Sequence, residues 1–263
     1  MAGYVILYLG ILYEGIMVST MKQVTIAGAI ALIVIFLFAS VIRYRKDRAL
    51  LKGILFGFLL FMATNLLLTI SEAVFPNLGI QKNGITGGIF MATALTAASL
   101  LILPAISKKV EYSSYLGQHM GYGFVLLTVI TNILVLANLF MFSFALNEGP
   151  GSEMLQTLDA KVIESWTEAL STNGPAYFLS VGLSAIFVYL VYSFALSMIT
   201  LYVYGKRPIK DVLVAFVSVL ALFVIPNLLL IAIPSSIVLM LSQFAVAAAS
   251  LYYLYKVNLE LKA

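Results

Sequence analysis

Three properties of this 263-residue sequence predict an all-α fold, a bundle of transmembrane helices. First, hydrophobic residues make up 62% of the chain and charged residues only 10%, with a mean hydropathy of +1.07. A water-soluble domain could not bury that much apolar surface. Second, the apolar residues form runs of about 20, the length that crosses a bilayer as a helix. Third, most Lys and Arg residues collect in short segments between these runs.

The apolar runs predict eight spans in a single integral membrane domain. Short segments of polar or helix-breaking residues separate the runs, such as Lys22-Gln23 after the first run and Pro76-Asn77 after the third. The predicted spans are 2–20, 24–42, 50–75, 84–107, 120–146, 175–204, 212–233 and 235–255. The start of the chain has no basic region and no cleavage site of small residues, so we expect the first helix to be retained.

Charge placement predicts how these spans are oriented in the cell membrane. Cytoplasmic loops collect Lys and Arg, and the densest basic cluster, 43–52, lies between the second and third predicted spans. If this loop is cytoplasmic, successive loops alternate between the two sides of the membrane. Twelve basic residues then lie inside and three outside, and both termini lie in the cytoplasm. The predicted cytoplasmic loop residues are Arg43, Arg45, Lys46, Arg48, Lys52, Lys108, Lys109, Lys206, Arg207 and Lys210. An alternative with seven spans, in which residues 1–21 lie on the outer face, leaves the other loops unchanged.

The long connection 147–174 predicts one amphipathic exterior helix over about 152–172. Its apolar side recurs at spacings of three and four, as a helix face does, and consists of Leu155, Leu158, Val162, Trp166 and Leu170. Its other side is acidic and consists of Glu153, Asp159, Glu164 and Glu168, with Lys161 as the one cation. One interpretation is an interfacial helix that lies on the bilayer with Trp166 in the aromatic belt. The alternatives are a lid over an outward-facing cavity and a docking site for a partner.

Small residues at helical spacing predict where helices approach closely. The fourth predicted span carries a ridge of Gly84, Gly88, Ala92 and Thr96. Shorter ridges are Gly53 with Gly57 on the third span and Ala245 with Ala249 on the eighth. These ridges describe a compact bundle and do not distinguish a channel from a scaffold.

Side-chain amides form a polar band near the middle of several predicted spans. They are Asn65, Asn132, Asn227 and Gln243, with Asn138 further out on the fifth span. One hypothesis is that they line a polar translocation pathway. The alternative is hydrogen bonding between helices, worth about 0.6 to 2 kcal/mol for each pair in membranes.

Two carboxylates fall inside predicted spans, and such residues are functional candidates because burying them in lipid is costly. Glu14 lies in the first span and Glu72 near the outer end of the third. One interpretation is a proton or cation site. The other is a rim of carboxylates neutralised by Lys22 and Lys82.

The residue inventory argues against most cofactor chemistry. His119, the only histidine, lies just before the fifth predicted span, at its cytoplasmic end, where we expect a wet interface residue. Bis-histidine haem ligation and multi-histidine metal sites need more than one histidine, and the chain has no cysteine. No Asp falls within a predicted span, and no Gly-rich phosphate loop occurs. We therefore expect no enzymatic activity, no cofactor and no metal, and a separate ATPase for any ATP-driven process.

Two classes of function stay open. The first is the membrane-embedded component of a transport or translocation system, whose basic loops are available to a cytoplasmic ATPase and whose assembly includes other membrane subunits. The second is an anchor subunit of a respiratory or other redox complex, with a quinone or single-haem pocket near His119. A structural scaffold is a third interpretation.

Composition adds a resemblance to a known family. Lys outnumbers Arg 11 to 4 and cysteine is missing, which resembles the composition of proteins from thermophilic archaea. In size, span count and composition the whole chain resembles the CedA membrane proteins of the crenarchaeal DNA import machinery. The resemblance implies a pore or pore scaffold for DNA that works with a separate ATPase, and it assigns no functional residue.

Overall fold

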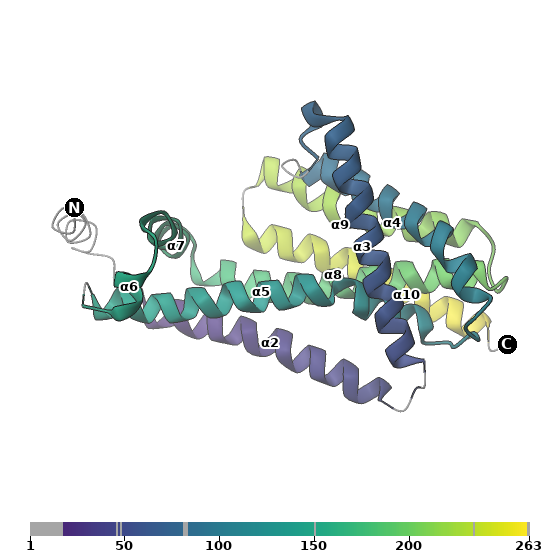
Figure 1. The fold of residues 1–263 in the computed structure, drawn as a ribbon, viewed down its shortest axis with the longest axis horizontal. Coiled ribbons are helices and arrows are strands. Elements are labelled where there is room, and N and C mark those ends of the chain that lie inside the picture. Colours follow the sequence, from purple (N-terminus) through teal and green to yellow (C-terminus); the bar gives the residue numbers. More distant parts are fainter. Residues whose placement is uncertain are drawn as a thin grey trace. The chain divides into compact units, whose positions relative to one another are not determined.

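The structure is a computed structural model that describes residues 18–45, 47, 49–80, 84–149, 151–233 and 235–261. The described residues form helices and no strands, which confirms the predicted fold class (Figure 1). Seven of the described helices are long and apolar enough to cross a membrane. Residues 1–17, and with them Glu14 and nearly all of the first predicted span, lie outside the described residues. The choice between eight and seven spans therefore stays a prediction.

The other seven predicted spans each coincide with one long helix, and the ends differ by about one helical turn. The described elements are α2 (Thr20–Tyr44), α3 (Leu50–Val74), η1 (Pro76–Leu78), α4 (Gly84–Ser107), α5 (Leu116–Glu148), α6 (Glu153–Thr157), α7 (Ala160–Thr172), α8 (Pro175–Val203), α9 (Lys210–Ala232) and α10 (Ser236–Glu260).

The break predicted at Lys22-Gln23 is wrong, because both residues lie in the first turn of α2. The helix begins one residue after Ser19, whose hydroxyl accepts a hydrogen bond from the Lys22 N–H at 3.3 Å, as an N-cap does. The two polar side chains are satisfied by protein groups: Lys22 Nζ donates to the Leu170 carbonyl at 2.5 Å, and Gln23 Nε2 donates to Ser143 Oγ at 3.1 Å. Polar side chains with such partners do not interrupt a helix.

The prediction of a single helix over 152–172 is also wrong, because the segment forms two helices, α6 and α7. The break falls at Leu158 and Asp159, which have extended backbone. Asp159 is the N-cap of α7, and its carboxylate accepts a hydrogen bond from the Lys161 N–H at 2.8 Å. A short acidic side chain that caps a helix competes with helix continuation, which explains the break.

The chain divides into two compact units. Unit 1 comprises residues 1–36 and 130–183, and unit 2 comprises residues 37–129 and 184–263. Unit 1 contains α6, α7 and parts of α2, α5 and α8, whereas α3, α4, α9 and α10 belong wholly to unit 2.

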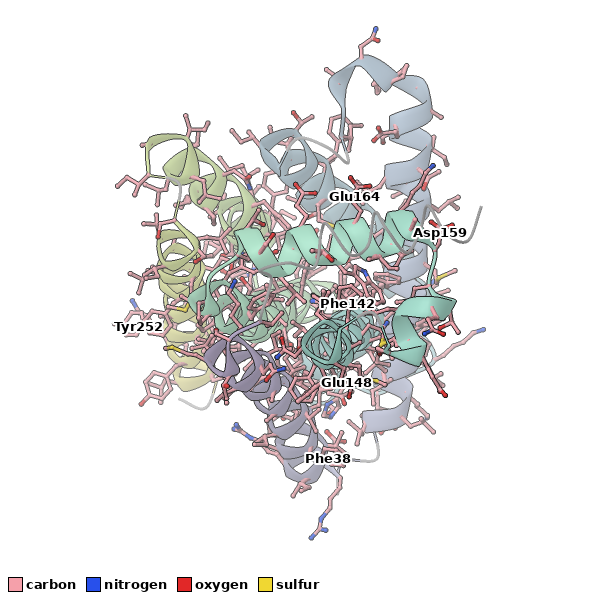
Figure 2. The ribbon with its side chains drawn as sticks, turned by 90° about the vertical axis from the view of Figure 1, so that its left-hand side faces the viewer. Phe38, Phe142, Glu148, Asp159, Glu164 and Tyr252 are labelled. Atoms are coloured by element: carbon pink, nitrogen blue, oxygen red, sulfur yellow. The ribbon has the colours of Figure 1, made fainter. Side chains whose placement is uncertain are left out.

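In unit 1, α7 lies across α5 (Figure 2). Trp166 packs edge-to-face on Phe142 of α5, with ring centroids 5.3 Å apart. Ile163 and Leu170 on the same side of α7 are buried, whereas Glu164 and Glu168 are exposed. Part of the apolar side of α7 is therefore covered by α5, and Trp166 is half-buried. The location of this segment on the bilayer, over a cavity or against a partner stays a prediction.

In unit 2, α3 packs on α4, α4 on α9, and α9 on α10. The predicted ridge on α4 is confirmed, since added Cβ atoms at Gly84 and Gly88 would lie within 2.4 Å of side-chain atoms of Asn227 and Phe223 on α9. The predicted ridge on α10 is wrong: Ala245 and Ala249 are exposed. The buried side of α10 consists of Ser242, Val246, Ala247, Ser250, Leu254 and Val257.

The first half of α5 lies between α3 and α8 in unit 2, and its glycines allow the backbones of both helices to approach closely. A Cβ added at Gly117 would lie 2.3 Å from the Ser197 Cα on α8, and one at Gly123 would lie 2.0 Å from the Ile54 carbonyl oxygen on α3. Across the α3 interface, a Cβ at Gly57 would lie 1.9 Å from the Met120 carbonyl oxygen. Real Cβ atoms do not approach backbone so closely, so only glycine permits these helices to pack with their backbones in contact.

We predict that Gly117→Ala destabilises the protein, because the new methyl group would force the α5 and α8 backbones apart. Overpacking of this kind costs about 1 to 3 kcal/mol, which outweighs the gain of about 1 kcal/mol in helix propensity from replacing glycine. The matched control is Gly28→Ala on α2, where an added Cβ has no neighbour within 4 Å. Thermal unfolding in detergent measures both variants. A Gly117→Ala protein as stable as the Gly28→Ala protein would contradict the packing argument.

Candidate functional site

The five amides of the predicted polar pathway are divided between the units. Asn132 and Asn138 belong to unit 1, and Asn65, Asn227 and Gln243 belong to unit 2. Two of them bond to their own helix: Asn65 Nδ2 donates to the Phe61 carbonyl at 2.8 Å, and Asn227 Nδ2 donates to the Phe223 carbonyl at 2.7 Å.

The other three amides differ in their surroundings. Gln243 Oε1 on α10 accepts a hydrogen bond from the Ser184 hydroxyl on α8. Asn132 is half-buried and Asn138 is exposed. Three of the five amides are thus engaged in bonds that stabilise helices or helix pairs, and the pathway stays a prediction. Of the two predicted ionisable residues, Glu72 is half-buried on α3, and Glu14 lies outside the described residues.

The structure instead brings polar and charged side chains together at one end of unit 2. This end, called the basic end below, consists of residues 43–45, 47, 49–52, 108–119, 197–211 and 253–260. These segments are joined by hydrogen bonds between residues far apart in the sequence. One example is Tyr204, whose hydroxyl donates to the Val110 carbonyl at 2.7 Å.

His119 is not a wet interface residue, because its exposed fraction is 1%. Its Nε2 lies 2.9 Å from Asp47 Oδ2, and the Ser113 hydroxyl donates to the same carboxylate oxygen at 3.1 Å. The His119 Cβ would lie 2.3 Å from a Cβ added at Gly53, so α3 closes over it. The imidazole therefore connects the loop after α2 with the start of α5.

The carboxylate of Asp47 also holds the loop before α3, by accepting a hydrogen bond from the Ala49 N–H at 2.8 Å. Burial by itself would raise the pKa of Asp47, but the hydrogen bonds from Ala49, His119 and Ser113 outweigh it, and the pKa lies below its usual value of 3.8. Asp47 is therefore ionised at neutral pH and attracts the donors around it.

A second network surrounds Asp211 in the first turn of α9. Asp211 has no exposed surface. Its Oδ2 accepts a hydrogen bond from Arg207 Nε at 2.5 Å, and its Oδ1 accepts one from the Tyr253 hydroxyl at 2.9 Å. Arg207 Nη1 also donates to Glu260 Oε2 at 2.6 Å. The loop before α9 is thus tied to the end of α10.

Arg207 consequently differs from the other predicted cytoplasmic cations. The hydrogen bonds from its guanidinium to Asp211 and Glu260 raise its pKa further above the normal range. Two carboxylates face this one cation, so it is not available to an anionic partner. The remaining described cations of the predicted loops are exposed: Arg43, Arg45, Lys52, Lys108, Lys109, Lys206 and Lys210. Lys46 and Arg48 lie outside the described residues.

Sequence reasoning missed Asp47, Asp211 and Tyr253. The statement that no Asp falls within a span is corrected, since α9 begins at Lys210 and includes Asp211. A usable indication was present, because Arg207 and Asp211 have the i,i+4 spacing of a helical ion pair. The contacts of Asp47 with His119 and of Asp211 with Tyr253 join distant segments, and no local pattern indicates them.

No protein-family model, curated protein or solved structure matches this chain. The resemblance to the CedA proteins therefore stays a prediction.

We predict that Tyr253→Phe lowers the stability of the protein, whereas Tyr252→Phe does not. The first change removes a donor from the buried Asp211 carboxylate, and a hydrogen bond to a charged group is worth about 1.5 to 3 kcal/mol. The second removes the hydroxyl of a side chain that is 70% exposed, where changes are usually within about 0.5 kcal/mol. Arg207→Gln should cost more, about 3 to 5 kcal/mol, because it leaves a buried charge without its partner. Equal unfolding midpoints for the two tyrosine variants would contradict the network.

We predict a pH-dependent difference in stability between the wild type and Asp47→Asn. Because the folded pKa of Asp47 is lowered, its contribution is present above the unfolded value of 3.8 and is lost as the pH falls through the lower folded value. The variant should therefore unfold at a lower temperature than the wild type at pH 6, and this difference in unfolding temperature should narrow as the pH is lowered below 3.8. The exposed carboxylate Glu111 provides the control variant Glu111→Gln. A gap that is constant with pH would exclude the ionised carboxylate as its cause.

Proposed function

We propose that this chain is the membrane-embedded component of a translocation system that works with a separate cytoplasmic ATPase. The single observation that supports the proposal is the combination of exposed cations and buried polar contacts at the basic end. Seven exposed Lys and Arg side chains, in loops and at helix ends, belong to this one end of unit 2.

The buried contacts make this surface suitable for a partner. The loop after α2 is held by Asp47 and His119, and the loop before α9 is held by Arg207 and Asp211. A surface whose loops are already ordered loses less conformational entropy when a partner binds. Exposed cations add long-range attraction for an acidic protein surface or for nucleic acid. These features support a docking surface in the cytoplasm, with both termini on the same side.

DNA enters the proposal through the resemblance to the CedA proteins, and it is the proposed substrate. A membrane component of this size without an ATPase motif would supply the passage or its scaffold, and the partner would supply the energy. Other membrane subunits of the same assembly would complete the passage.

The surroundings of His119 argue against the alternative of an anchor subunit with a single haem. The Nε2 atom that would bind iron already lies 2.9 Å from Asp47 Oδ2, and His119 is only 1% exposed. A haem bound to this atom would have to displace the carboxylate.

The proposal predicts that neutralising four cations stops partner binding without unfolding the protein. The variant carries Lys52→Gln, Lys108→Gln, Lys109→Gln and Lys210→Gln, all at exposed positions. We expect the ATPase that co-purifies with the wild type in mild detergent to be lost, and DNA uptake per folded molecule to fall at least about tenfold, the effect of 1.4 kcal/mol. The unfolding midpoint should stay within the small range typical of surface changes.

Two controls accompany this variant. Replacing the same four residues with Arg keeps the charge and should retain both the partner and DNA uptake. Because the chain has no cysteine, single cysteines at the exposed positions Ser171 and Lys109 test orientation: Ser171 should be labelled from outside the cell and Lys109 should not. Unchanged uptake in the glutamine variant, or the reverse labelling pattern, would contradict the proposal and favour a structural scaffold.

A further inference from the structure

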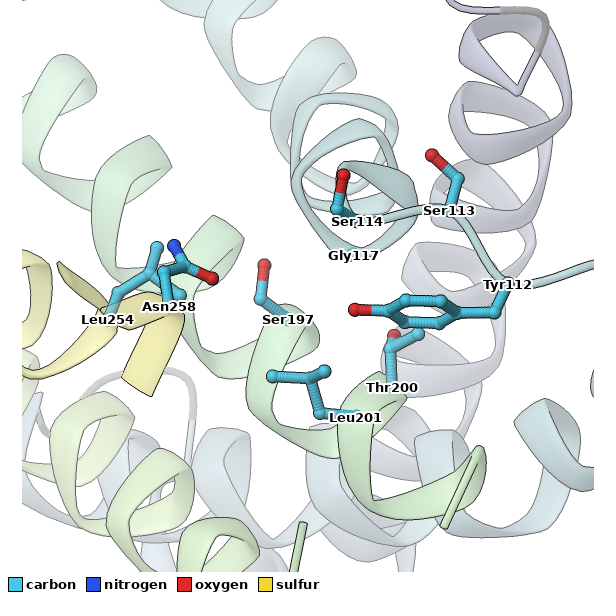
Figure 3. Close-up of a pocket in the computed structure, with 9 residues that line it drawn as sticks. All are labelled: Tyr112, Ser113, Ser114, Gly117, Ser197, Thr200, Leu201, Leu254 and Asn258. Carbon is cyan, nitrogen blue, oxygen red and sulfur yellow. The ribbon is translucent and has the colours of Figure 1, made fainter. Parts of the chain in front are cut away.

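A pocket opens at the basic end of unit 2, between the start of α5, α8 and α10 (Figure 3). Its lining residues are Tyr112, Ser113, Ser114, Gly117, Ser197, Thr200, Leu201, Leu254 and Asn258. The empty space measures about 250 Å³ when the open side is included. The enclosed floor has room for roughly one water-sized atom. The pocket therefore admits one oxygen of a ligand to its floor and leaves the rest of the ligand near the opening.

The pocket is lined by neutral hydrogen-bonding groups. Tyr112, Ser113, Ser114, Ser197 and Thr200 supply five hydroxyls, and Asn258 supplies an amide. None of the lining side chains is a carboxylate. In Figure 3 the Tyr112 hydroxyl points toward Ser197, across the pocket. Burial raises the pKa of Tyr112, so its hydroxyl stays protonated at neutral pH and can donate.

Several of these groups have unused hydrogen-bonding capacity. Among the described residues, no hydrogen bond is found for the side chains of Tyr112, Ser114 and Asn258. Thr200 is 1% exposed, and its hydroxyl has only a weak acceptor, Met120 Sδ at 3.9 Å. Donors without protein partners can bond to a ligand that has several acceptor atoms without breaking a bond within the protein.

A cation lies beside the pocket. Lys206 Nζ lies 5.6 Å from the centroid of the Tyr112 ring, which lines the pocket, and the Lys206 side chain is exposed. Three carboxylates of the basic end are engaged, Asp211 and Glu260 by Arg207 and Asp47 by His119, and Glu111, next to Tyr112 in the chain, is exposed. Hydroxyl and amide donors beside an available ammonium group match the several acceptor oxygens of a phosphate.

The position of the pocket identifies the source of the phosphate. The pocket lies at the ends of three membrane-spanning helices, at the level where a bilayer places its headgroups. Leu201 and Leu254 form an apolar part of its wall, which suits the glycerol and upper acyl chain of a lipid. Basic pockets between spans are known binding places for anionic headgroups. We propose that this pocket binds the phosphate of an anionic membrane phospholipid. The proposal does not depend on the proposed translocation function.

The experiment measures binding of short-chain lipids to the purified full-length protein in detergent, by native mass spectrometry and by the rise in unfolding temperature. The probes are dioctanoyl phosphatidylglycerol, dioctanoylglycerol, which lacks the phosphate, and inorganic phosphate. We expect saturable binding of the phosphatidylglycerol, no binding of dioctanoylglycerol, and at most weak binding of inorganic phosphate.

Two variants identify the site. Tyr112→Phe removes the donor and keeps the ring, and Asn258→Ala removes the amide from a different helix. Each should raise the Kd for phosphatidylglycerol at least about tenfold, which corresponds to about 1.4 kcal/mol. The matched control is Tyr252→Phe, which removes a phenolic hydroxyl from α10 outside the pocket and should leave the Kd unchanged. Unfolding midpoints without lipid show whether each variant is folded. If the Tyr112→Phe protein is unfolded, the Kd of the Asn258→Ala protein tests the site instead.

Each other outcome overturns the proposal in a distinct way. Equal affinity in all three variants means that the lipid binds elsewhere or without specificity. Equal binding of dioctanoylglycerol means that the contact is apolar only. Tight binding of inorganic phosphate with no gain from the lipid tails means that the pocket is a site for a free anion. None of these results bears on partner binding by the four exposed lysines, so failure here is distinguishable from failure of the proposed function.

Discussion

The close approach of the α5 backbone to α3 and α8 is the constraint on which the arrangement of unit 2 depends. Gly117 and Gly121 let α8 approach one side of α5, while Gly123 and Gly57 let α3 approach another. In a membrane the lipid is as apolar as the helix surfaces, so association depends on such close van der Waals contact rather than on the hydrophobic effect. These contacts also place His119 under α3 and Ser197 beside the start of α5, and so they position both the Asp47 network and the hydroxyl pocket.

A buried carboxylate is the second constraint on the structure of the basic end. A carboxylate such as Asp211 is costly to remove from water unless it is paired and hydrogen-bonded. Arg207 and Tyr253 satisfy it here, and the same contacts join the segment before α9 to α10. Most cations of the loops take no part in this pairing and stay on the surface. One end of the unit thereby combines hydrogen-bonded buried carboxylates with exposed cations, and the proposed docking surface rests on this combination.

Residue chemistry alone predicted part of the candidate site and misassigned the rest. The loops that carry the exposed cations were predicted, because Lys and Arg in short segments between apolar runs are visible without a structure. Arg207 was grouped with them, although two carboxylates hold it. His119 was expected in a wet environment because it stands at the end of an apolar run. Its burial depends on Gly53, 66 positions earlier in the chain, and the sequence does not show which helices meet.

The sequence by itself determined the fold class, seven described spans to within about a turn, and the acidic side of the segment 152–172. These properties follow from composition and from the period of the helix, and both are local. Only the tertiary structure decided that Lys22 and Gln23 lie within α2, that Ala245 and Ala249 face outward, and that α7 rests on Phe142. In each case the outcome depends on a partner from a distant segment. A polar side chain is accommodated in an apolar helix when a carbonyl or hydroxyl oxygen accepts its hydrogen bond. A small residue forms part of a helix interface only when a second helix packs on it.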